Sequence, residues 1–116
     1  MFESPISPGS GVPLHLHHHQ EEWFYVLAGE FLIEVGGEQH ELATGMSILG
    51  PRQVPHRFRN KGLAVGKLLI LVQPAALLEE CFAALSQLPE KDRQNAELLK
   101  KLVAQYDIEI IGPPLP

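Results

Sequence analysis

The chain has 116 residues, 45% of them hydrophobic and 20% charged, and a formal net charge of −5 at pH 7. This balance is typical of one globular domain and excludes a mainly disordered chain. No apolar run approaches the ~20 residues that span a bilayer, and the acidic excess argues against nucleic acid as a partner. The first eleven residues lack the pattern of a secretory signal, and the single cysteine, Cys81, cannot form an internal disulfide. We therefore expect a cytoplasmic protein.

Short strands and tight turns are predicted for the residues before Pro74, where nine of the ten glycines lie. The pair Gly36-Gly37 separates two strand-like runs, which is a strong hairpin signal because both turn residues can adopt positive φ. Six to eight short strands at a spacing of roughly ten residues favour a small barrel or sandwich. Strand-like runs or turns that bound them are found at residues 30–35, 38–42, 46–49, 56–60, 60–62 and 68–72.

Two helices are predicted after Pro74, where Leu, Ala, Glu and Lys dominate. Apolar residues recur at helical spacing from Leu77 to Leu88 and again from Ala96 to Tyr106, and Pro89 interrupts the pattern. The tail from Asp107 to Ile111 is strand-like again. We expect a β-barrel over residues 1–74 and a helical extension with a β-like tail over residues 75–116, packed on the same domain. The helices should cover one outer face or edge of the barrel.

Histidines and one glutamate form the main candidate site. His15 and His17 are separated by one residue, so both imidazoles point to the same face of a strand. Glu22 follows after a loop, and His56 begins another predicted strand. Three neutral imidazoles and one carboxylate can hold a divalent ion and leave coordination positions open for water or substrate.

The spacing of these residues resembles the two motifs of the cupin superfamily. The resemblance covers the chain up to about residue 74, and Gln53 stands where the second motif usually has glycine. It implies a mainly β fold, a small double-stranded β-helix or jelly-roll barrel, here with two C-terminal helices. It also implies that the metal ligands are His15, His17, Glu22 and His56. The motif positions are Gly9, His15, His17, Glu22 and Gly29 in the first motif, and Gly45, Pro51, His56 and Asn60 in the second.

Several functions are compatible with this resemblance. Similarity to flavonol-dioxygenase-like cupins implies a metal-dependent dioxygenase acting on a small organic substrate, with Glu22 doubling as a catalytic base. A non-catalytic module that binds or senses a small ligand is the alternative, and an isomerase, decarboxylase or lyase is a further enzyme class. The expected cofactor is one divalent ion of Fe, Mn, Ni, Cu, Co or Zn, because all of these accept imidazole and carboxylate.

Aromatic residues next to Glu22 bear on the cavity and on assembly. Phe24 and Val26 share the strand parity of Glu22 and are expected to line the cavity. Trp23 and Tyr25 lie on the opposite face, under the helices or in a dimer contact. A homodimer is expected because open sheet edges need cover, and the β-like tail offers a strand to exchange.

The arginines near His56, the single cysteine and the other histidines are the remaining candidate residues. Arg52 lies in the loop before His56, where it can reach the barrel mouth and favour an anionic substrate. Arg57 and Arg59 should face outward by alternation, toward solvent or an interface. Cys81 falls inside an apolar helical stripe, which indicates a buried structural thiol rather than a nucleophile. Surface positions are expected for His18, His19 and His40.

Overall fold

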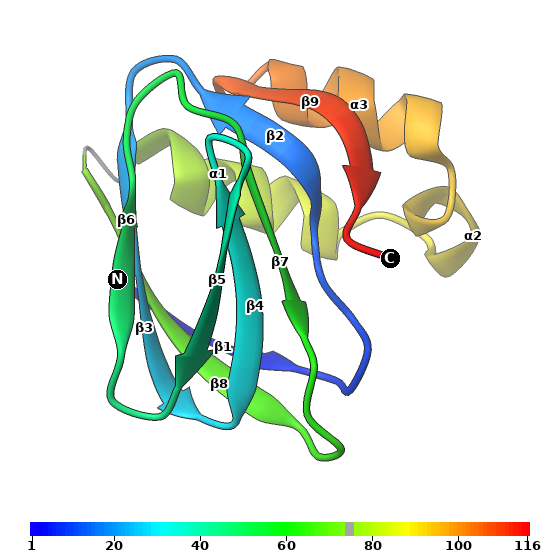
Figure 1. The fold of residues 1–116 in the computed structure, drawn as a ribbon. Coiled ribbons are helices and arrows are strands. Elements are labelled where there is room, and N and C mark those ends of the chain that lie inside the picture. Colours follow the sequence, from blue (N-terminus) through cyan, green and yellow to red (C-terminus); the bar gives the residue numbers. More distant parts are fainter. Residues whose placement is uncertain (74–75) are drawn as a thin grey trace.

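The computed structural model describes residues 1–73 and 76–116 of the chain. The domain boundary expected at residues 74–75 lies outside the described residues. Within the two described ranges the chain forms nine strands and three helices (Figure 1). In chain order they are β1 Phe2–Ile6, β2 Pro13–His17, β3 Glu21–Ala28, β4 Glu30–Val35, β5 Glu38–Ala43, β6 Ser47–Gly50, β7 His56–Asn60, β8 Gly66–Gln73, α1 Ala76–Ser86, α2 Glu90–Arg93, α3 Ala96–Ala104 and β9 Ile108–Pro114.

Two antiparallel sheets face each other, which confirms the predicted jelly-roll class of fold (Figure 1). One sheet has the strand order β1-β8-β3-β6 and the other β5-β4-β7-β2-β9. The predicted hairpin joins β4 and β5, with Gly36 at φ 58° and Gly37 at φ 85° in its turn. Both glycines adopt positive φ, a conformation that is unfavourable for residues with a Cβ atom, so the hairpin turn depends on them.

The core lies between the sheets and is built from alternate residues of the strands. The ring of Phe58 packs edge-on against Phe24 at 5.8 Å and Phe31 at 6.3 Å between ring centroids. Phe24 and Val26 are 1% and 0% exposed and are not among the described residues that line the cavity. The expectation that these two side chains line the cavity is therefore wrong, because they are buried in the core between the sheets.

The C-terminal helices differ from the expectation in number, and they lie at the edge, one of the two places expected for them. A four-residue helix, α2, follows Pro89, so three helical segments replace the two predicted. Phe82 of α1 meets Phe2 of β1 with 5.0 Å between ring centroids, and α3 packs beside β9 (Figure 1). Because β1 and β9 are edge strands of opposite sheets, the helices lie at the edge of the two sheets, as one of the two expected alternatives had it, and not on an outer face. Among residues 1–73 and 76–116, no helix has the length and apolarity needed to cross a membrane.

The C-terminal tail is a full member of the second sheet. Strand β9 pairs with β2 and continues through Pro113 and Pro114, beyond the predicted end at Ile111. Proline is tolerated there because β9 is an edge strand. Arg57 donates to the carboxylate of Glu34 at 2.8 Å and to the carbonyl of Pro113 at 2.9 Å. Arg57 thus links the C-terminal tail to β4 through Glu34. Strand β9, which was expected to exchange between protomers, pairs with β2 of its own chain.

Candidate metal centre

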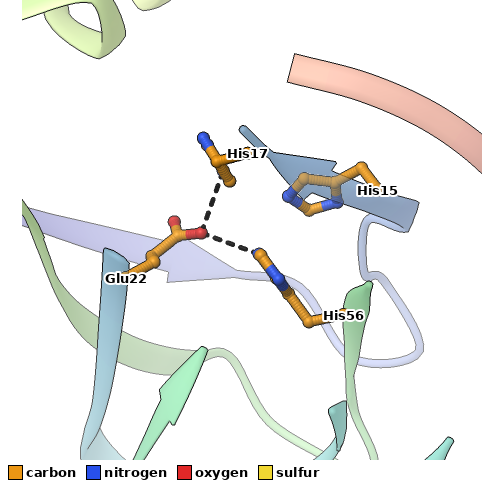
Figure 2. A group of neighbouring side chains, drawn as sticks. All are labelled: His15, His17, Glu22 and His56. Carbon is orange, nitrogen blue, oxygen red and sulfur yellow. Dashed lines mark hydrogen bonds and ion pairs between the residues drawn. The ribbon is translucent and has the colours of Figure 1, made fainter. Parts of the chain in front are cut away.

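The four predicted site residues meet at one point inside the fold. Strand β2 supplies His15 and His17. Glu22 is the second residue of β3, which belongs to the other sheet, and His56 begins β7 directly opposite His15. Figure 2 shows the three rings and the carboxylate pointing toward one another, and one potential ligand atom from each lies within 4.8 Å of the others. His17 and His56 are each 1% exposed and Glu22 is 6% exposed. Residues far apart in the sequence are therefore brought into one buried cluster.

Each imidazole is oriented by a contact of its Nδ1 atom. His15 Nδ1 lies 2.7 Å from the carbonyl of Pro13, and His56 Nδ1 lies 3.1 Å from the carbonyl of Val54. His17 Nδ1 lies 3.0 Å from Oε1 of Gln20. All three partners are oxygen acceptors, so each Nδ1 donates its proton outward. In a neutral ring this leaves the Nε2 lone pair for the cluster, which is the usual tautomer of a metal-binding histidine.

The carboxylate of Glu22 completes an electron-rich centre. Its Oε2 atom lies 3.2 Å from Nε2 of His17 and 2.8 Å from Nε2 of His56 (Figure 2). Lone pairs this close, away from water, require a proton or a cation between them. Imidazole nitrogen and carboxylate oxygen are ligands that divalent transition metals accept, so the cluster could hold a metal ion.

The protonation of the cluster follows from burial and from Glu22. Burial, with His56 nearby, lowers the pKa of His15 to about 4. Burial also acts to lower the pKa of His17, but the carboxylate of Glu22 outweighs it and raises that pKa. Burial would raise the pKa of Glu22, yet hydrogen bonds from His17 and His56 hold it well below its usual range. The raised pKa of His17 therefore favours a proton between His17 and Glu22, at the place where a metal ion would bind.

Loading the cluster with zinc is expected to release protons, because the ion competes with the proton that the raised pKa of His17 favours. Bound imidazoles have pKa values below their unfolded value of ~6.5, so metal-derived stability is present above that pH and lost on acidification. The loss should steepen toward pH 4, where His15 also protonates. Zinc titration calorimetry in two buffers of different ionisation enthalpy measures the proton count. Equal zinc affinity at pH 5 and pH 7.5 would contradict this.

Gln20 is a site residue that sequence reasoning missed. It lies in the connection between β2 and β3, is 2% exposed, and accepts the Nδ1–H of His17. A lone glutamine in a loop carries no periodic signal and stands between the motif positions. Its burial beside His17 indicates that it fixes the orientation and tautomer of this ring.

Replacing Gln20 by leucine is expected to weaken zinc binding by ~10–100-fold, the usual cost of removing a partner that orients a metal-binding histidine. The variant Gln20→Glu keeps an acceptor oxygen for His17 Nδ1 and should retain affinity close to the parent's. Competition with a chromophoric chelator measures both. If Gln20→Leu binds zinc as tightly as the parent, the orienting role is wrong.

A cavity of about 290 Å³ opens beside the cluster. His15, His17 and Glu22 form one part of its lining. The rest is almost wholly apolar and comes from both sheets, from α1 and from α3. A ligand in this cavity would therefore touch both the cluster and an apolar wall.

The remaining candidates lie outside the cavity lining described by the structure. His18 and His19 are on the surface as predicted, where they pair with Glu109 and Asp107, each at 2.9 Å. Arg52 forms an ion pair with Glu21 rather than lining the cavity, so the structure gives no support to its attracting an anionic substrate.

The thiol of Cys81 is fully buried in the core. Burial raises its pKa, which keeps the thiol protonated and a poor nucleophile. The expectation of a structural thiol agrees with this environment.

In a comparison with known protein families, residues 3–72 match the Cupin domain family. Protein SchB of Streptomyces halstedii is 38% identical over 71 residues, which are 61% of this chain and 51% of that protein. Polyketide synthase CurC of Streptomyces cyaneus is 30% identical over 71 residues, 61% of this chain and 46% of that protein. The chain thus spans about half the length of these curated relatives.

Solved structures show the same architecture. A protein of Thermus thermophilus superposes with a TM-score of 0.57 and 33% identity, over 60% of this chain and 66% of that one. A predicted oxalate decarboxylase of Thermotoga maritima gives a TM-score of 0.58 and 26% identity, over 60% of this chain and 61% of that one. The helices and β9 lie beyond residue 72, where the family match ends.

Proposed function

Since the chain belongs to the cupin family, we propose that it is a metal-dependent member that holds one divalent transition metal ion through His15, His17, Glu22 and His56. The observation that carries this proposal is the convergence of four potential ligand atoms within 4.8 Å of one another beside a cavity. Four protein ligands leave coordination positions for a small organic molecule in that cavity.

The reaction we propose is the oxidation of that molecule by dioxygen. A redox-active ion in such a site supplies electron transfer to dioxygen and polarises an oxygen of the substrate. The apolar walls of the cavity exclude water and position the substrate beside the cluster. Glu22, buried and held by two histidines, is placed to accept the proton that an enolic or phenolic substrate loses.

A second candidate function is binding or sensing of a small ligand without turnover. Among the described residues that line the cavity, the titratable side chains are His15, His17 and Glu22, all of which belong to the cluster. A separate acid or base for proton transfer is not among them, which favours binding over catalysis. Isomerase or lyase chemistry that begins with loss of a substrate proton would also use Glu22 as the base, whereas decarboxylation needs no base.

Two measurements separate these candidates. Elemental analysis of protein purified without a histidine tag tests the metal, and we expect close to one transition metal ion per chain. Oxygen consumption by protein loaded in turn with iron, manganese, nickel, copper and cobalt tests the reaction, with enolic, phenolic and thiol compounds as substrates. If the protein binds metal but consumes no oxygen with any of these metals, the binding module replaces the dioxygenase as the proposed function. If the protein takes up no metal, both the metal site and the dioxygenase reaction are rejected.

We also propose that two copies of the chain associate through the outer face of the four-stranded sheet. Trp23 and Tyr25 are 44% and 40% exposed there. Their register partners on the same face are Leu49, Leu69, Leu71 and Ser47, so this face carries a mainly apolar patch rather than scattered single apolar residues.

The parent is expected to sediment as a dimer at micromolar concentration, and Trp23→Glu as a monomer, because a buried unpaired carboxylate would oppose association. Leu63→Glu is the control, since Leu63 is fully exposed in a loop outside the patch. Sedimentation velocity measures all three proteins. A monomeric parent, or dissociation by both substitutions, would reject this interface.

A further inference from the structure

Half of the cavity lining outside the cluster comes from the C-terminal segment, and two of its residues, Ile110 and Ile108, are the strand-pairing partners of His15 and His17. The family match ends at residue 72, whereas α1, α3 and β9 all lie beyond it. These three elements place only apolar side chains on the lining. They are Phe82, Leu85, Leu99, Val103, Ile108 and Ile110.

The lining is poor in polar groups and lacks basic ones. Apart from the cluster residues, Ser4 is the only hydrophilic side chain among the described residues that line the cavity, and these include neither lysine nor arginine. Arg52, which was expected to reach the barrel mouth, is engaged by Glu21. Arg57 is likewise engaged by Glu34 and by the carbonyl of Pro113. Nothing in the described lining can therefore neutralise an anionic group that lies away from the cluster.

Charge balance restricts the ligand further. A divalent ion together with the carboxylate of Glu22 carries one net positive charge, because the imidazole ligands are neutral. One ionised oxygen on the ligand cancels this charge. A dianion such as oxalate or a phosphate monoester would leave a negative charge uncompensated against apolar walls, which is costly without a paired cation.

We propose that the cavity takes an apolar, ring-containing phenol or enol that presents a single ionisable oxygen to the cluster, and that it rejects small dianions. The part of this proposal that concerns the ionised oxygen rests on the proposed metal site, whereas the apolar selectivity rests on the lining alone. A volume of about 290 Å³ is near the lower end of the ~300–1,000 Å³ of small-molecule sites, which suits a ligand of one or two rings. The C-terminal segment, not the family-matched strands alone, sets this preference.

Calorimetry on zinc-loaded protein with 2-naphthol, oxalate and glucose 6-phosphate tests the selectivity without turnover, because zinc is not redox-active. We expect 2-naphthol to bind at least tenfold more tightly than either dianion. Leu99→Lys places an ammonium group on the half-buried wall of α3, so it should weaken 2-naphthol at least tenfold and strengthen glucose 6-phosphate. Leu98→Lys is the matched control, since Leu98 is also half-buried on α3 but does not line the cavity.

The metal-free protein separates this inference from the metal proposal. If the protein takes up no zinc, the metal-dependent function fails, but 2-naphthol should still enter the apolar cavity and Leu99→Lys should still weaken it more than Leu98→Lys. Tighter binding of oxalate or glucose 6-phosphate to the parent would overturn the inference. Equal effects of the two lysine substitutions, or no binding of 2-naphthol to either form, would also overturn it.

Discussion

Replacing His17 by alanine is expected to remove most of the bound metal. The substitution deletes one nitrogen donor of the proposed site. Of the two histidines that contact Oε2 of Glu22, only His56 then remains. The loss of affinity should exceed the ~10–100-fold that removal of an outer partner costs, because a coordinate bond itself is lost. Elemental analysis after dialysis against equimolar zinc, expressed per folded protein, gives the result.

A second substitution and a control make this test specific. His17→Gln preserves more of the buried volume, so loss of metal in both variants cannot be assigned to a cavity left by alanine. His40→Ala removes a histidine from β5, where His40 pairs with Glu38 on the surface, and should retain the metal. Full metal occupancy in both His17 variants would remove His17 from the ligand set.

The four residues of the cluster could be predicted from sequence because strand alternation and the resemblance to the two cupin motifs agree on them. Strand parity puts His15 and His17 on one face, and motif spacing adds Glu22 and His56 from distant strands. Gln20 could not be predicted in this way. Its role depends on how the β2–β3 connection folds back on His17, which is a tertiary contact with no repeat in the sequence.

The strands with clear alternation were also predictable, and the exceptions have physical causes. Strand β1 was not identified because Phe2–Ile6 contains Ser4 and Pro5, which are poor strand formers, and its strand pairing is with the distant β8. Helical spacing predicted α1 and α3 but left open whether they cover an outer face or an edge. Each has an apolar stripe that fits a sheet face or a sheet gap equally well, and only the edge strands β1 and β9 decide between the two.

Replacing Glu22 by glutamine is expected to lower oxygen uptake per bound metal ion by at least about 100-fold if the proposed dioxygenase chemistry holds. The side chain keeps nearly the same shape, but it loses the negative charge and the ability to accept a proton. General base catalysis contributes typically ~10²–10⁴-fold, which sets the size of the effect. Metal content must be measured in the same samples, because Glu22 is also a proposed ligand and loss of the ion would imitate loss of the base.

Glu21→Gln is the matched control for this substitution. Glu21 precedes Glu22 on β3, so its side chain points to the opposite face of the sheet, where it pairs with Arg52. The same chemical change at this position should leave oxygen uptake per metal ion close to the parent's. If Glu22→Gln and the parent consume oxygen equally per bound metal, Glu22 is a ligand at most, and the substrate must lose its proton to another group or to water. A large loss in Glu22→Gln alone would assign the base to the carboxylate that His17 and His56 hold in place.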